Sequence, residues 1–398
     1  MKYGLVVYLK TDNIGDDILS YAASRFLPSI DYIIDRENLD LFSPEEKEPV
    51  SAILNGWFLH EKSHWPPSPY INPLFIGIHF TDNKFHGIKD AYLDGLGKDY
   101  LVEHAPIGCR DFSTLEKMKQ RDIDAYFSGC LTLTLEPYPD AEKHGKYILT
   151  DVPEQVRKRV CEAVGEDQIE FVSHNADEKY SNQNWEQRSR DVECLLKKYQ
   201  GAKCVITTRL HCALPCLALG VPVLLLLDDN EDTRYRIASY KDYVTHCSVS
   251  EFLQREFDWQ NPFSNTEKYK DLQQSLIKCC RDFIERSGSY ESNITLPDLS
   301  LFHTFWKEKA LWQRSLLADD FMGISKRAWQ EQLDSQKWYV EQIEAKDKRI
   351  HELEAWVPQL EAQISELKTW IGELEKGKKW LEEHSAEQER YIQSLLNR

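Results

Sequence analysis

Short hydrophobic runs alternate with amphipathic segments along the first 290 residues of the chain. A run of apolar residues without regular polar alternation is typical of a parallel strand that is buried on both faces. In the first part of the chain, such runs occur at residues 3–9, 51–54, 74–80, 106–109 and 125–135. Amphipathic helical patterns lie between several of them, for example at residues 18–27 and 113–120. This alternation predicts a half that is built from βα units.

A polar, proline-containing stretch at residues 136–145 predicts a linker to a second half of the same kind. That half contains predicted strands at residues 147–151 and 169–174 and predicted helices at residues 153–164 and 185–199. Two consecutive halves of alternating strands and helices predict an α/β fold, with two Rossmann-like domains that face a cleft.

Residues 204–227 give the clearest pattern of the second half. They predict a buried strand at 204–207, a helix that ends at Gly220, and a second buried strand at 221–227. Arg209 and His211 stand where the first strand gives way to the helix, with Thr208 as a candidate N-cap. Open parallel sheets bind ligands at the carboxyl ends of their strands, and the N-terminal end of a helix attracts anions. The arginine adds a planar donor for phosphate or carboxylate. This segment therefore predicts an anion site with a titratable group beside it.

Beyond residue 265 the strand-like runs stop, and the remaining patterns are helical. A helix is predicted at residues 268–285, followed by a break at 288–300 and a tryptophan-bearing helical stretch to about residue 340. In the last sixty residues, Ile or Val recurs every seventh position from 343 to 371, and Leu does so from 353 to 381. These are the a and d positions of a heptad repeat. β-Branched residues at a with leucine at d favour a parallel two-stranded coiled coil.

Three residues interrupt this heptad pattern. Lys346 and Lys378 occupy seam positions and weaken the seam, and Pro358 at position b predicts a kink or a restart of the helix. We predict a homo-oligomer through this C-terminal coiled coil. The alternative is a helix that folds back onto its own chain.

Composition limits the class of protein. The 398 residues carry a formal net charge of −17 and are 41% hydrophobic. These values favour folded domains with a core, and they disfavour binding to nucleic acid or to an anionic membrane surface. No stretch approaches the ~20 apolar residues of a transmembrane helix, and the N-terminus shows a strand pattern rather than a signal peptide. The ten cysteines include no CxxC pair. We therefore predict a reduced, cytoplasmic protein without disulfides or a bound metal.

Residues 60–64 spell HExxH, a pattern of zinc proteases, in which both histidines must share one face of a helix. Here Pro66 and Pro67 follow almost at once, and a strand-like end precedes the motif. Because prolines so close leave little room for a helix, we do not predict a metalloprotease.

Three ordered blocks resemble the polysaccharide pyruvyl transferase family. The block at residues 208–211 (TRLH), followed by 220–223 (GVPV), is similar to the signature of that family. Residues 12–18 (DNIGDDI) resemble its opening motif, and residues 107–111 (IGCRD) with 127–135 (FSGCLTLTL) resemble its middle segment. The likeness covers roughly residues 1 to 240.

The resemblance implies a fold and a reaction. The fold is of the GT-B type, with an N-terminal domain on the acceptor side (1–140) and a second domain on the donor side (141–290). Here a helical connector (291–340) and the coiled coil (341–398) follow. The reaction takes phosphoenolpyruvate (PEP) as donor substrate, with no further cofactor, and joins its pyruvyl group to two hydroxyls of a glycan precursor as a ketal. The glycan context implied is surface-polysaccharide synthesis.

The chemistry of that reaction assigns roles to the matching residues. The donor anion requires cations or N–H groups, which Arg209, Leu210, Arg110 and Arg234 would supply. Protonation of the methylene carbon requires a general acid, which we predict to be His211. For Arg209 and His211 the alternative is a structural ion pair and a satisfied core histidine; for Arg234 it is pairing with the acidic run before it.

The acceptor side is predicted from the loops after two other strands. Asp16 is a candidate base or hydroxyl ligand, and Asn13, Gly15, Asp17, Ser128 and Gly129 are candidate acceptor-binding residues. Gly15 would permit a tight turn and a close approach of the ligand to the backbone. The alternatives are that Asp16 caps the following helix and that Arg110 pairs locally with Asp111. His79 and His174, at predicted strand ends, are candidates for the cleft wall or for the core.

Two other functions fit the same sequence. A GT-B glycosyltransferase would bind a nucleotide sugar in the cleft instead of PEP. A non-catalytic glycan- or partner-binding protein would depend on its coiled coil and would tolerate a change of His211.

Overall fold

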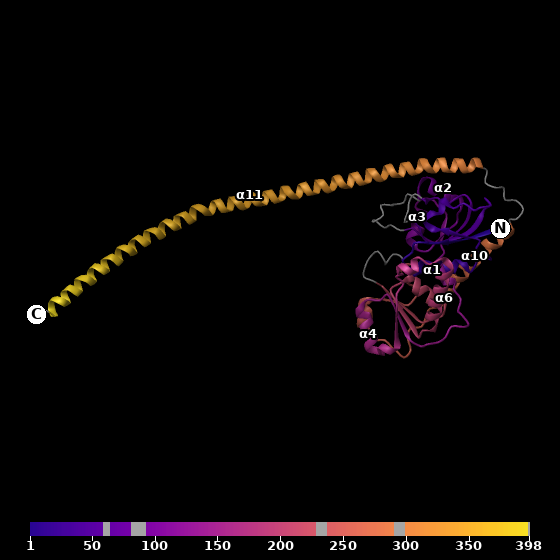
Figure 1. The fold of residues 1–398 in the computed structure, drawn as a ribbon, viewed down its shortest axis with the longest axis horizontal. Coiled ribbons are helices and arrows are strands. Elements are labelled where there is room, and N and C mark those ends of the chain that lie inside the picture. The colour runs from indigo at the N-terminus through magenta and orange to yellow at the C-terminus, as the bar shows by residue number, and fades with distance from the viewer. Residues whose placement is uncertain (59–63, 81–92, 228–236, 290–298, 397–398) are drawn as a thin grey trace. The chain divides into compact units, whose positions relative to one another are not determined.

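The computed structural model describes residues 1–58, 64–80, 93–227, 237–289 and 299–396 (Figure 1). Arg234, which was predicted to bind PEP, and the first four residues of the HExxH motif therefore lie outside the described residues. Contacts divide the chain into two compact units, Met1–Leu317 and Ala318–Arg398. The first unit holds two parallel sheets with helices around them, and the second is helical. The α/β class is therefore confirmed, together with a long C-terminal helix.

The first sheet has six parallel strands in the order β2-β1-β3-β4-β5-β6. Their bounds are β1 Lys2–Val7, β2 Tyr32–Asp35, β3 Val50–Phe58, β4 Ile71–Phe80, β5 Ile107–Cys109 and β6 Ala125–Phe127. The accompanying helices are α1 Ile14–Ser24, η1 Arg36–Leu41, α2 Gly95–Glu103, α3 Phe112–Lys119 and η5 Leu131–Thr134. The central strands β1, β3 and β4 are almost wholly buried, as their continuous apolar runs predict.

The second sheet has five parallel strands in the order β11-β10-β9-β7-β8. Their bounds are β7 Tyr147–Thr150, β8 Ile169–Val172, β9 Cys204–Thr207, β10 Val223–Leu227 and β11 His246–Ser248. The helices of this half are α4 Glu154–Val164, η6 Glu166–Gln168, α5 Glu178–Ser181, α6 Trp185–Gly201, α7 Leu210–Ala218 and α9 Val249–Gln254. Thr150 is in register with Thr207 of β9 and with Val172 of β8, so these three strands end level with one another.

Helix α7 lies between β9 and β10 as predicted, although its start differs from the prediction. Arg209, and not Thr208, occupies the N-cap position and makes no side-chain capping bond. The Thr208 hydroxyl instead donates to the carbonyl of Asp151 at 2.8 Å. After the helix, Gly220 has a φ of +72°, the left-handed conformation in which glycine commonly ends helices.

One predicted strand is shorter than its apolar run. The run at residues 125–135 begins as β6, but Gly129 has a φ of +75° and the chain continues as the 3-10 helix η5. A Cβ at residue 129 would lie 2.6 Å from Cδ2 of Leu272, in α10. The apolar residues of η5 are fully buried, which explains why the sequence does not distinguish them from a buried strand.

The chain after the second sheet returns to the first. Helix α10, Lys270–Ser289, packs against η5, β3 and β4. Helix α11 spans Leu299–Leu396 as a single helix with Pro358 inside it, so the helix does not restart at that proline. Within the first unit, Lys309 of α11 is buried and ion-paired with Asp40, and Trp312 packs against the core of the first sheet. No helix in the described part of the chain combines the length and apolarity that crossing a membrane requires.

Candidate active site

A cavity of about 340 Å³ lies at the carboxyl edge of the second sheet, where residues of the first half also reach it. Its lining combines cationic, imidazole and apolar side chains: Asn13, Arg110, Asp151, Pro153, His174, Thr208, Arg209, Leu210, His211, Ile237 and Val249. Four predicted site residues besides Asn13 are therefore brought together, namely Arg110, Arg209, Leu210 and His211. Leu210 opens α7, where backbone N–H groups have no partner within the helix.

Arg110 and His211 meet in this cavity from different halves. Arg110 follows β5 and His211 is in the first turn of α7, and Nη1 of the arginine lies 3.2 Å from Nε2 of the histidine. A guanidinium can only donate hydrogen bonds, so Nε2 of His211 accepts and the proton of the neutral ring is on Nδ1. Arg110 is only 2% exposed. Among the described residues, no carboxylate oxygen lies within ion-pair distance of its guanidinium, and its Nε has no hydrogen-bond partner there. The described part of the site thus contains a buried cation without a paired anion.

Asp111 does not neutralise Arg110 by a local salt bridge. Its carboxylate caps α3 through the N–H of Thr114 at 2.9 Å, and it accepts from Nδ1 of His79 at 2.5 Å and from Ser113 at 2.6 Å. Burial raises the pKa of Asp111, but the bond and charge of His79, with lesser contributions from Arg110 and Ser113, outweigh burial and lower it overall. His79 is consequently a satisfied structural histidine.

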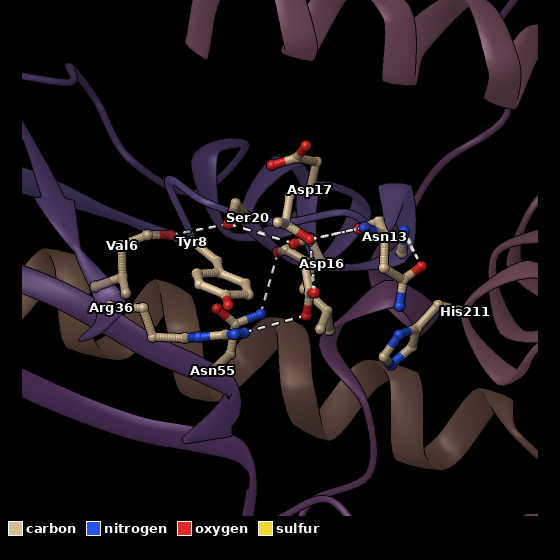
Figure 2. Close-up of polar contacts among 12 residues, drawn as sticks. Val6, Tyr8, Asn13, Asp16, Asp17, Ser20, Arg36, Asn55 and His211 are labelled. Atoms are coloured by element: carbon tan, nitrogen blue, oxygen red, sulfur yellow. Dashed lines mark hydrogen bonds and ion pairs between the residues drawn. The ribbon is translucent and has the colours of Figure 1, made fainter. Parts of the chain in front are cut away.

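Gly15 provides space for His211. Figure 2 shows His211 beside Asn13 at the N-terminal end of α1. A Cβ on Gly15 would lie 3.1 Å from Cβ of His211 and 3.2 Å from its Nδ1. Gly15 is inside α1 and has no positive φ, so it is not required for a tight turn. His211 therefore packs closely against Gly15, and the approach of a ligand to this part of the backbone stays a prediction.

Arg209 is oriented by the neighbouring strand ends. Its Nε donates to Oδ2 of Asp151 at 2.9 Å, and its Nη2 donates to Oδ1 of Asn175 at 2.7 Å. The side chain is still 35% exposed, so part of the guanidinium is open to a ligand. Arg209 and Arg110 thus bring two cationic groups to one cavity.

Asp151 is held in an uncommon conformation by its partners. It directly follows β7 and has a φ of +51°, which is rare for a residue with a side chain. Its carboxylate accepts from the backbone N–H of His174 at 2.9 Å and from Ser173 at 2.7 Å. Burial raises its pKa, but these two hydrogen bonds and the charge of Arg209 outweigh burial and lower the pKa below its usual value. Asp151 therefore remains ionised and fixes Arg209.

His174 lines the cavity while also belonging to the core. It is fully buried, and its Nε2 lies 2.8 Å from the hydroxyl of Tyr199 on α6. Its carbonyl accepts from the N–H of Ile14, which joins the loop after β8 to the start of α1. His174 thus belongs both to the cavity wall and to the core, the two places considered for it from the sequence.

The loop before α1 is built around Asp16 and Arg36 (Figure 2). Asn13, and not Asp16, caps the helix, because its side chain accepts from the N–H of Gly15 at 3.0 Å. Oδ1 of Asp16 is ion-paired with Arg36 at 3.1 Å, and its Oδ2 accepts from Thr11 at 2.9 Å. The guanidinium of Arg36 also lies 4.3 Å from the ring centroid of Tyr8. Both oxygens of Asp16 are therefore engaged, and this residue is not among those that line the cavity.

Asp17 lies between the two halves and not at the cavity. It has no exposed surface, it accepts from the hydroxyl of Tyr180 at 2.7 Å, and it lies 3.4 Å from Nη1 of Arg188. Burial raises its pKa to about 6, against the opposing charge of Arg188 and the bond from Tyr180. The position of Asp17 indicates a role in joining the halves.

Ser128 and Gly129 also lie away from the cavity lining. The Ser128 hydroxyl accepts from the N–H of Gly77 at 3.0 Å and lies 3.1 Å from the carbonyl of Cys109, so it connects β4, β5 and the end of β6. Gly129 makes room for Leu272. Their assignment to the acceptor site stays a prediction, as does that of Asp16 and Asp17.

Asp151 and Asn175 were not predicted from the sequence. Asp151 ends one predicted strand of the second half and Asn175 follows another, at the edge where ligands bind, and this position was the available signal. Of the HExxH motif, only His64 is described. Its Nδ1 lies 2.8 Å from Oδ1 of Asp40.

A comparison with protein families agrees with the sequence blocks. The model of the family described as polysaccharide pyruvyl transferase matches residues 13–230, which is more than half of the chain. A search of curated proteins finds no match. Among solved structures, the chain is similar to an uncharacterized protein from Klebsiella pneumoniae subsp. pneumoniae NTUH-K2044, at 13% identity and a TM-score of 0.37, over 62% of this chain and 92% of that one. Because this family match covers more than half of the chain and most strands of both sheets, the chain belongs to the polysaccharide pyruvyl transferase family.

Proposed function

We propose that this protein transfers the pyruvyl group of PEP to two hydroxyls of a sugar as a ketal, in the cytoplasmic synthesis of a surface glycan. The observation that carries the proposal is the guanidinium of Arg110, which is 2% exposed in the cavity wall and has no carboxylate partner among the described residues. A buried charge without a counter-ion is costly, and such a site is completed by an anionic ligand. PEP carries a carboxylate and a phosphate, and the cavity has two arginines to receive them.

Donor binding would use both arginines. Arg110, with open donors in the buried wall, suits one anionic group by a bidentate contact. Arg209, held by Asp151, and the first N–H groups of α7 suit the other. An anion bound between Arg110 and His211 would accept the hydrogen bond that Nη1 of Arg110 now donates to Nε2 of His211. It would also favour the protonated imidazole, because it offsets the positive charge of the arginine.

The reaction then needs proton transfers that balance. His211, protonated on Nε2, delivers a proton to the methylene carbon of PEP, and the adjacent carbon becomes electrophilic. One sugar hydroxyl attacks that carbon, and its proton passes to His211, which is thereby protonated again. The carbon–oxygen bond to phosphate breaks, and the second hydroxyl forms the second ketal bond. Its proton leaves with the phosphate.

The acceptor would occupy the rest of the cavity. A volume of about 340 Å³ exceeds what the ten non-hydrogen atoms of PEP require. Asn13 lines this volume from the first half and is suited to bind a hydroxyl. Because both carboxylate oxygens of Asp16 are engaged, one by Arg36 and the other by Thr11, we assign it the task of holding the start of α1 in place.

The test is the release of phosphate from PEP in the presence of lipid-linked and nucleotide-linked sugars. The wild type should release phosphate only with a suitable acceptor, and His211→Ala should abolish the release while still binding PEP. His351→Ala is the matched control, since His351 is exposed on α11 and its ring contacts only a carbonyl of its own helix. Binding of a nucleotide sugar without any binding of PEP would replace this proposal with a glycosyltransferase. Loss of function on removal of the tail, with no effect of His211→Ala, would indicate a non-catalytic binding protein.

A further inference from the structure

The C-terminal part of α11 exposes a continuous apolar seam. The exposed fraction of its a and d residues runs from 49% for Leu353 to 69% for Leu374. The same spacing continues beyond residue 381, with Ile392 at a and Leu395 at d, both more than half exposed. A sustained stripe of this kind on a single helix requires a partner helix to cover it.

The polar residues of the seam restrict how two copies can pair. Between residues 343 and 395, four of the sixteen seam positions are polar: Lys346, Lys378, Ser385 and Gln388. In a parallel pair in register, each of them faces the same residue of the second copy. In an antiparallel pair with full overlap, each a position faces a d position of the second copy. The residue numbers of two facing positions then sum to 738, so that Lys378 faces Leu360 and Ser385 faces Leu353. All four polar residues would then face Ile or Leu. Burial of a polar group against an apolar one is unfavourable, so the parallel register is preferred.

The charges beside the seam favour the same arrangement. Six of the seven e positions from 347 to 389 are acidic, with Lys368 as the exception, and no g position from 349 to 391 is acidic. Antiparallel helices place e beside e, which would bring carboxylates together along most of the seam. Parallel helices place each g beside the e five residues later in the partner, which brings Arg349 to Glu354 and His384 to Glu389.

We propose that the seam from Ile343 to Leu395 binds a second copy of this chain as a parallel, in-register two-stranded coiled coil. Lys378 at an a position fits this role, because a polar a residue specifies register and strand number at some cost in stability. In the single helix its Nζ lies 3.8 Å from Glu382, which reduces the repulsion between two facing lysines. Both copies of the α/β unit would then be joined to the same end of the coil. This proposal does not depend on the proposed reaction.

Cysteine crosslinking of the full-length chain tests the orientation. In a background with the exposed Cys194 changed to Ser, we introduce Leu353→Cys at a d position or Ser385→Cys at an a position. In the parallel arrangement each variant crosslinks to itself under mild oxidation, and a mixture yields no product between 353 and 385. The antiparallel arrangement gives the opposite result and would overturn the proposal. Ala362→Cys, at the outward f position, is the control that should not crosslink.

Charge reversal tests the flanking pairs. Arg349→Glu should raise the dissociation constant of the dimer roughly tenfold, because it replaces two attractive contacts with two repulsive ones. Adding Glu354→Arg should restore most of the affinity. Arg390→Glu, an equal charge change at an f position, controls for net charge. Light scattering that gives a monomer or a trimer for the wild type, or a double variant as weak as the single one, would refute the proposal, whatever the phosphate-release assay shows.

Discussion

Gly15→Ala separates the packing of His211 from the stability of α1. Gly15 is inside the helix without a positive φ, so the backbone accepts alanine, and helix propensity alone would add about 0.5–1 kcal/mol of stability. The new Cβ would, however, lie 3.1 Å from Cβ of His211, where ordinary contacts begin at 3.4 Å. The start of α7 or of α1 must therefore move by the difference, about 0.3 Å.

We expect Gly15→Ala to change the rate of phosphate release far more than the melting temperature. Because a misplacement of 1 Å in a reacting group can cost ~100-fold in rate, a shift of this size should lower acceptor-dependent phosphate release from PEP by roughly tenfold. The melting temperature should change by no more than about 3 °C, because the strain and the gain in helix propensity oppose each other. Gly372→Ala is the matched control, since it is also helical and its Cβ would meet nothing within 4 Å. Unchanged phosphate release in Gly15→Ala would refute the idea that this glycine positions His211.

The other predictions concern buried charges. The pKa of Asp17 is raised from 3.8 to about 6, so its cost to the fold grows as pH rises through this interval. The unfolding free energy of wild type relative to Asp17→Asn should therefore fall by about 2 kcal/mol between pH 4 and pH 7, and a constant difference would contradict this. Arg110→Met should weaken PEP binding roughly 100-fold by calorimetry without lowering the melting temperature, because no counter-ion lies beside this cation in the described residues; a strongly destabilised variant would show that Arg110 is structural. Lys309→Ala should cost about 3 kcal/mol in denaturant unfolding because it removes the buried ammonium that pairs with Oδ2 of the buried Asp40, whereas the exposed Lys307→Ala should be neutral; equal effects would argue against the buried pair.

The sequence predicted those parts of the fold that local patterns determine. The bounds of β9 agree with the predicted strand, because an unbroken apolar run between polar ends is specific to a buried parallel strand. The strands β2 and β11 were not predicted, since Asp31 and Asp35 interrupt the apolar run of β2, and β11 has polar residues at two of its three positions. Arg209 and His211 could also be predicted from the sequence, because both lie within one βαβ unit, whose pattern is local.

The rest of the site depends on contacts between distant segments. Asp17 is separated from Tyr180 by 163 residues, and Gly15 meets His211 from the other half of the chain. No periodicity or motif spacing encodes such pairs. Asp16 and Asp17 are adjacent and chemically identical in the sequence, yet one is ion-paired with Arg36 and the other with Arg188. Only the three-dimensional structure distinguishes them.

The contacts between the two halves limit how this protein can be recombined with its relatives. Asn13 and Asn175 form a β-bridge, Asp12 accepts from the N–H of Ala176, and Asp17 binds Tyr180 and Arg188. In a chimera that takes its first half from one relative and its second half from another, each of these contacts would join a residue of one parent to a residue of the other. The two parents would therefore have to match at every pair. The two sheets are therefore not interchangeable modules, and a search for new acceptors by shuffling should exchange loops at the cavity rim while it keeps residues 12–17 and 174–188 from the same parent.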